Sequence, residues 1–132
     1  MTGPVLIVDD DRDLREALSQ TLELAGYTPL PAAAFIAAKD YLSADFEGVV
    51  ITDMMMPGRD GFHLLDYART VDPDLPVILL TGQGTVPTAV RALDQGAFAF
   101  LEKPCASADL LACVADAQAA RRQTLQGRQE RQ

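Results

Sequence analysis

The strongest constraint on the fold is a regular alternation of short apolar runs with longer segments of helical periodicity. The apolar runs resemble buried strands, and they occupy residues 5–8, 28–32, 48–52, 77–80 and 98–101. The segments between them repeat apolar residues every three or four positions, as amphipathic helices do, over residues 11–25, 33–42, 61–70, 85–95 and from 107 to 121 or beyond. The sequence therefore predicts five strand–helix units.

Polar residues and glycines indicate where the predicted helices begin and end. Asp11, Asp60 and Ser107 stand where N-cap residues are favoured. Gly26 and Gly96 follow two of the helical segments, as glycines that end a helix do. The helix boundaries are thus predicted independently of the apolar pattern.

Alternating strands and helices favour a parallel sheet with helices on both faces. Right-handed crossovers restrict such a chain to a doubly wound sheet. Five strands of this size predict an α/β fold of the flavodoxin-like (βα)5 type, with strand order 2-1-3-4-5. The second strand carries two prolines, Pro29 and Pro31, and is therefore predicted at an edge of the sheet.

Composition narrows the classes of partner. The formal net charge is -8, and residues 1–120 hold seven basic and eighteen acidic side chains. Such a body is expected to repel nucleic acid and anionic membranes. The two cysteines match no metal or redox motif, and no signal peptide or membrane-spanning run is apparent. We therefore expect a cytoplasmic protein that binds neither nucleic acid nor membrane directly.

Polar side chains follow four of the predicted strands. Asp9 and Asp10 follow the first, Asp53 the third, Thr81 the fourth and Lys103 the fifth. Ligand sites of open α/β sheets lie beyond these carboxyl ends, and the ends of strands one and three are neighbours in the predicted order. Three carboxylates that converge there would repel one another. Oxygen-only ligands of this kind favour Mg²⁺ as the ion that relieves the repulsion.

A carboxylate, a metal ion, an ammonium and a hydroxyl together can hold a phosphoryl group. Lys103 and the metal would neutralise charge on the transferring oxygens, and the central carboxylate of Asp53 can act as a nucleophile. A simpler interpretation of Asp9 and Asp10 is a solvated helix start, where acids favour the helix dipole. That interpretation suits Asp11 and Asp13 better, as N-cap and first-turn residues.

The sequence closely resembles the receiver domains of two-component response regulators over residues 5–121. The motifs are "IVDDD" at 7–11, "TDMMMPGRDG" at 52–61, "LLTG" at 79–82 and "FAFLEKP" at 98–104. The resemblance implies that Asp53 accepts a phosphoryl group from a sensor histidine kinase. It also implies that Asp10 binds Mg²⁺ directly, Asp9 mainly through water, and Met55 through its backbone carbonyl.

The resemblance implies further roles near the fifth strand. Thr81 and Lys103 would contact phosphoryl oxygens, and Thr81 and Phe100 would form the switch. A cis peptide bond would precede Pro104. The surface made by helix 85–95, strand 98–101 and the last helix would respond to phosphorylation and form a homodimer. Apart from assisting its own phosphorylation and dephosphorylation, such a domain is not expected to be an enzyme.

Within the family, the chain is most similar to the nitrogen-regulator class of sigma-54-dependent transcription activators. We therefore expect residues 1–121 to form the receiver domain and residues 122–132 to begin a linker helix. In this interpretation the chain is a fragment, and the linker leads to a missing AAA+ domain and a DNA-binding domain. The alternatives are a magnesium-dependent phosphohydrolase, a phosphate-independent interaction module, and a single-domain receiver with a different output.

Overall fold

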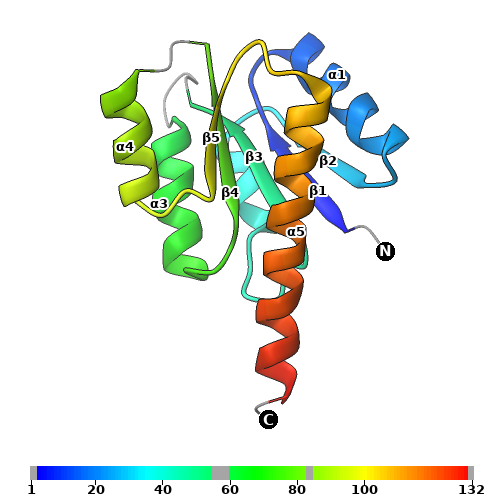
Figure 1. Ribbon diagram of the computed structural model, residues 1–132, viewed down its shortest axis with the longest axis vertical. Helices are drawn as coiled ribbons and strands as arrows, with labels where there is room; N and C mark the ends of the chain where they lie inside the picture. Colours follow the sequence, from blue (N-terminus) through cyan, green and yellow to red (C-terminus); the bar gives the residue numbers. More distant parts are fainter. Residues whose placement is uncertain (1–2, 55–59, 83–84, 131–132) are drawn as a thin grey trace.

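The computed structural model describes residues 3–54, 60–82 and 85–130. Five parallel strands form one sheet in the order β2-β1-β3-β4-β5, which confirms the predicted fold (Figure 1). The strands are β1 (Pro4–Val8), β2 (Thr28–Ala32), β3 (Val49–Asp53), β4 (Val77–Thr81) and β5 (Ala99–Glu102). The helices are α1 (Arg12–Leu24), α2 (Phe35–Ala38), the 3-10 helix η1 (Lys39–Tyr41), α3 (Gly61–Val71), α4 (Val86–Asp94) and α5 (Ser107–Glu130).

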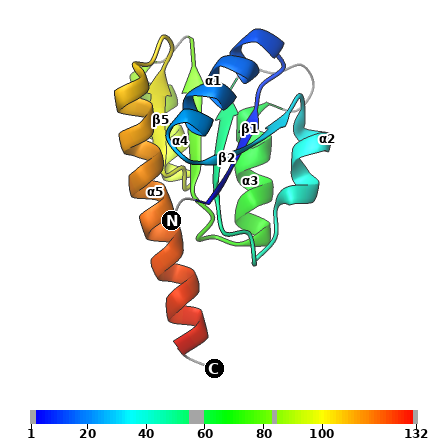
Figure 2. The ribbon, with the colours of Figure 1, turned by 90° about the vertical axis from the view of Figure 1, so that its right-hand side faces the viewer.

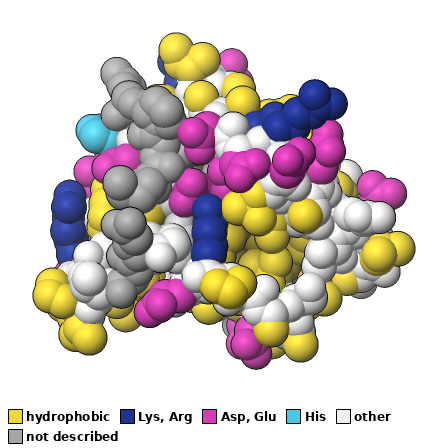
Figure 3. All heavy atoms as spheres, turned by 90° about the horizontal axis from the view of Figure 1, so that it is seen from above, with side chains coloured by type: hydrophobic (Ala, Val, Ile, Leu, Met, Phe, Trp, Pro, Cys, Tyr) yellow, Lys and Arg dark blue, Asp and Glu magenta, His cyan; other side chains and the backbone are white. Residues whose placement is uncertain are grey.

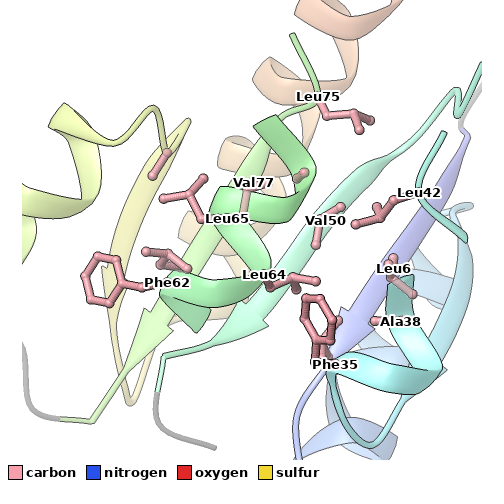
Figure 4. Packing of buried hydrophobic residues seen from close by; sticks show 14 of the residues in the cluster. Leu6, Phe35, Ala38, Leu42, Val50, Phe62, Leu64, Leu65, Leu75 and Val77 are labelled. Atoms are coloured by element: carbon pink, nitrogen blue, oxygen red, sulfur yellow. The ribbon is translucent and has the colours of Figure 1, made fainter. Parts of the chain in front are cut away.

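The sheet lies between two helical layers because successive strand residues point to opposite faces. On one face Leu6 and Val50 pack against α2 and α3, as Figure 4 shows. On the other face Val5 and Ile51 pack against α1 and α5. Figure 2 shows the sheet between these layers. The central strands are buried on both faces, which explains their continuous apolar sequences.

Most of the predicted helix boundaries are correct. The Asp11 side chain caps α1 by accepting from the amides of residues 13 and 14, and Asp60 caps α3 in a capping box with His63. Gly26 and Gly96 have φ angles of 93° and 97°, a region that favours glycine. These local signals were predictive because each satisfies backbone groups that a helix end leaves unpaired.

Two predicted boundaries were wrong. Ser107 is the first helical residue of α5 rather than its cap, because the Leu110 amide closes the first turn on the Ala106 carbonyl at 3.0 Å. The predicted helix over 33–42 is the single-turn α2 followed by η1, and Ala34, which precedes α2, makes no side-chain cap.

Within the described residues, no helix combines the length and the apolar character that a membrane-spanning segment needs.

Strand β2 is an edge strand, as its prolines predict. Its hydrogen bonds to the β1 segment come from alternate residues. The Thr28 amide donates to the Gly3 carbonyl, and the Ala32 carbonyl accepts from the Asp9 amide. The backbone groups of Pro29 and Pro31 therefore point away from β1, toward the open side of the sheet.

A buried arginine anchors α5 across the end of the sheet where the strands begin. The Arg121 side chain is fully buried. Its guanidinium donates to the carbonyls of Phe46 and Ala44, at 2.8 and 3.0 Å, and to the Asp72 carboxylate at 2.9 Å. Buried charges are tolerated only with such complete pairing, so Arg121 belongs to the interior of the domain.

The ionised form of Asp72 stabilises the folded protein. Hydrogen bonds from Arg128, the Asp74 amide and Arg121 lower the pKa of Asp72 far below its usual range, although burial alone would raise it. Because the pKa of Asp72 is lower in the folded chain, its contribution is fully present above the unfolded pKa of about 3.9 and is lost as pH falls below it. Acid should therefore weaken this region.

We expect Asp72→Asn to flatten the loss of stability in acid. The free energy of unfolding, measured by urea denaturation between about pH 5 and pH 3, should fall less steeply in the variant than in the parent. A difference of about 1 kcal/mol over this range is expected of a strongly paired aspartate whose unfolded pKa is about 3.9. Asp45→Asn, at an exposed position, serves as the control. Parallel curves for parent and Asp72→Asn would contradict the prediction.

Candidate functional site

The predicted site residues gather at the end of the sheet where the strands finish. Asp53 and Thr81 are the last residues of β3 and β4. Asp9 directly follows β1, and Lys103 directly follows β5. The strand order places these four chain segments side by side along one edge. Figure 3 views the molecule from this end and shows acidic side chains gathered across the middle of the face.

Three aspartates form a cluster within reach of a single ion. Carboxylate oxygens of Asp9, Asp10 and Asp53 all lie within 4.8 Å of one another. Asp9 and Asp53 are buried, whereas Asp10 is exposed. The Asp11 amide donates to Asp9 Oδ1 at 2.9 Å, and this fixes the orientation of the Asp9 carboxylate. Two buried acids and one exposed acid thus face the same point.

Lys103 supplies a positive charge to this cluster. Its Nζ lies 3.1 Å from Asp53 Oδ1 and 3.3 Å from Asp9 Oδ2, and its side chain is largely buried. The backbone of Lys103 is fixed as well, because its amide donates to the Thr81 carbonyl at 2.7 Å. The peptide bond between Lys103 and Pro104 is cis. The ammonium is therefore held directly beside the central carboxylate.

The charges of the cluster are incompletely balanced. The pKa of Asp9 is raised, chiefly by burial and then by the neighbouring Asp53 carboxylate, and this rise outweighs the lowering by the Asp11 amide and by Lys103. One ammonium serves two buried carboxylates. A divalent cation bound by these hard oxygen ligands would relieve the repulsion. The residues present therefore fit Mg²⁺.

Thr81 and Phe100 occupy adjoining strands beside the cluster. Thr81 is completely buried, one residue beyond Leu80, which pairs with Asp53 in the β3–β4 register. Phe100 is half-buried on β5 and packs against the core on the α3 side of the sheet. Met55, the predicted backbone ligand, lies outside the described residues.

Sequence reasoning missed two residues that build the site. A Cβ atom on Gly61 would lie 2.8 Å from the Asp53 carbonyl oxygen, so only glycine lets α3 start this close to the end of β3. The Arg15 guanidinium donates to the Asp9 carbonyl at 2.8 Å and ties α1 to the cluster. The "PGRDG" sequence predicts a turn that contains glycine. Nothing in the local sequence predicts the close approach of Gly61 to Asp53 or the hydrogen bond from Arg15 to Asp9.

Comparison with known families identifies the class of protein. The family model described as "Response regulator receiver domain" matches residues 5–115. Apart from Pro4 at the start of β1, this range contains all five strands, and it contains every site residue described above. The chain therefore belongs to the response regulator receiver domain family.

Individual relatives are consistent with this family. The C4-dicarboxylate transport transcriptional regulatory protein DctD of Rhizobium meliloti is 48% identical over 124 residues. That alignment covers 94% of this chain but 27% of the relative, so the chain spans about a quarter of that protein's length.

Solved structures of receiver domains share the fold. A receiver domain from Clostridium thermocellum has a TM-score of 0.85 and 30% identity, covering 93% of this chain and 98% of its own. The beryllofluoride-activated NtrC4 receiver domain dimer has a TM-score of 0.83 and 36% identity, covering 89% of this chain and 98% of its own.

Proposed function

We propose that this chain is a phosphorylation-dependent switch in which Asp53 accepts a phosphoryl group from a sensor histidine kinase. The observation that carries the proposal is the position of the Lys103 ammonium. Its Nζ lies 3.1 Å from Asp53 Oδ1 and also contacts the buried carboxylate of Asp9. Asp10 would bind Mg²⁺ directly, with Asp9 acting mainly through water and the Met55 carbonyl as a further ligand. A bound Mg²⁺ would neutralise charge on the phosphoryl oxygens.

The chain's own groups would carry out the transfer. A carboxylate oxygen of Asp53 attacks the phosphorus atom of a phosphohistidine, a P–O bond forms, and the P–N bond to the imidazole breaks. The departing imidazole takes a proton from solvent. Lys103, already beside Asp53, pairs with a phosphoryl oxygen, and the Thr81 hydroxyl donates to another. Asp53 and Lys103 belong to the cluster described above, and Thr81 ends the adjoining strand β4.

The response would appear on the surface formed by α4, β5 and α5. Val86, Val90 and Leu93 on α4 and Phe98 just before β5 are 77%, 51%, 53% and 39% exposed, so this surface offers apolar side chains for a contact. Movement of Thr81 toward the phosphoryl group would let Phe100 repack. The exposed apolar side chains would then pair with a second copy of the chain. Similarity to the NtrC4 receiver domain, which forms a dimer when activated by beryllofluoride, supports this pairing.

The output would be control of transcription in the cytoplasm. Similarity to DctD supports a sigma-54-dependent activator in which an AAA+ domain and a DNA-binding domain follow the receiver. By the same similarity, C4-dicarboxylate transport genes are the proposed target. Residues 1–121 would form the receiver and residues 122–132 the start of the linker helix, with neither nucleic acid nor membrane bound by this part directly. A receiver coupled to another output is the alternative within the family.

Phosphodonor labelling tests the proposed function. After incubation with acetyl phosphate and Mg²⁺, mass spectrometry should find one added phosphoryl group, mapped to Asp53 by borohydride trapping of the acyl phosphate. Chelation of Mg²⁺ with EDTA should reduce labelling by at least about tenfold, because charge on the transferring oxygens is then less well neutralised. Rapid turnover of small phosphate monoesters without a stable adduct would instead favour a phosphohydrolase.

A further inference from the structure

The C-terminal half of α5 extends beyond the body of the domain. Figures 1 and 2 both show this half continuing below the lower end of the sheet. Its sequence from 122 to 130 contains a single large apolar residue, Leu125. Propagation of a helix beyond its packed part is only marginally favourable in water, so contacts with the domain body would add to the helical order of this segment.

Arg121 and Arg128 supply that contact from one face of the helix. They stand seven residues apart, or two helical turns, and both bind Asp72. Arg128 binds it in bidentate fashion, with Nη1 2.7 Å from Oδ2 and Nη2 2.7 Å from Oδ1. Two parallel bonds between a guanidinium and a carboxylate fix the geometry as well as the charge.

Acceptors from two separate loops converge on these arginines. The Ala44 carbonyl accepts from Arg121 at 3.0 Å and from Arg128 at 3.3 Å. Asp74 Oδ2 lies 3.1 Å from Arg128 Nη2. These acceptors belong to the segment before β3 and to the segment between α3 and β4. The helix is therefore attached to two independent parts of the domain, which restricts its direction more than one attachment would.

We propose that Arg121, Arg128 and Asp72 form a clasp that fixes the direction in which α5 leaves the domain. The clasp makes α5 one rigid unit with the domain body as far as Arg128, seven residues beyond the domain boundary predicted from the sequence. Whatever follows the helix is then presented at a set angle rather than on a flexible tether. This inference is independent of the phosphoryl chemistry proposed for Asp53.

Amide hydrogen exchange in the 132-residue chain tests the clasp. Arg128→Ala should accelerate exchange of residues 122–130 by about tenfold, while exchange in β1, β3 and β4 stays at the parental rate. Alanine favours helix at least as well as arginine, so faster exchange would report lost contacts rather than lost propensity. The partly exposed Arg128 side chain makes this variant compatible with folding.

Two matched variants complete the design. Gln123→Ala truncates an exposed side chain in the same stretch of the helix and should keep the parental exchange rates. Arg128→Lys retains the charge without the bidentate geometry and should show an intermediate rate. The clasp would be overturned if Arg128→Ala exchanged like the parent, or if Gln123→Ala accelerated exchange as much as Arg128→Ala.

Discussion

Replacing Asp53 with asparagine is expected to abolish phosphoryl acceptance. The amide keeps the size of the carboxylate but is too weak a nucleophile to attack phosphorus. Incubation of the variant with acetyl phosphate and Mg²⁺ should leave its intact mass unchanged under conditions that label the parent. Because the amide matches the carboxylate in size, the substitution removes a charge from beside Asp9 and Lys103 without opening a cavity. The variant should therefore stay folded.

The control for this variant removes an aspartate from the same region without touching the cluster. Asp66 is exposed on α3, and Asp66→Asn should be labelled to the parental extent. Circular dichroism of both variants would establish that the fold is retained. Undiminished labelling of Asp53→Asn would mean that another side chain is the acceptor, and the proposed function would then be wrong.

Replacing Arg121 with methionine should destabilise the domain by about 3 kcal/mol. The substitution removes the donor to the Phe46 carbonyl and leaves the Ala44 carbonyl and the Asp72 carboxylate with Arg128 but without their buried donor. Methionine fills a similar volume, so the loss would come from unsatisfied polar groups rather than from a void. The free energy of unfolding from urea denaturation at neutral pH measures the effect.

Gln123→Met, two residues further along the helix and exposed, is the matched control. Surface substitutions of this kind usually change stability by less than about 0.5 kcal/mol. Equal stabilities for the Arg121→Met and Gln123→Met variants would show that the buried arginine contributes no more than a surface residue. The anchoring of α5 described above would then need another explanation.

The fold could be predicted because its determinants are local. Each central strand is a continuous apolar run, since helices cover both faces of the sheet. Asp11, Asp60, Gly26 and Gly96 marked helix ends that the structure contains. The short helix after β2 was extended too far because a single turn of helix lacks the length that periodicity requires.

The site could be predicted in part, because parallel strands bring their carboxyl ends to one edge. That rule places Asp9, Asp53 and Lys103 together, and the structure has them in contact. The charge balance among them depends on burial and distance, which no spacing reveals. The roles of these residues in metal binding and phosphoryl transfer rest on the family resemblance and stay predictions.

The anchoring of α5 could not be predicted from the sequence. Arg121 and Arg128 stand in a polar tail that resembles an exposed linker, and their partner Asp72 lies in a loop far away along the chain. A buried arginine leaves no local pattern, because only the tertiary fold determines which polar groups lose contact with water. The sequence therefore indicated the helix but not its attachment.

The outward-facing prolines of β2 limit how copies of this domain can associate. An added strand needs backbone N–H donors along the edge that it joins, and Pro29 and Pro31 have none to offer. Growth of the sheet across this border, which underlies many fibrillar aggregates, is thereby discouraged. Self-association would then use another surface, such as the proposed one formed by α4, β5 and α5.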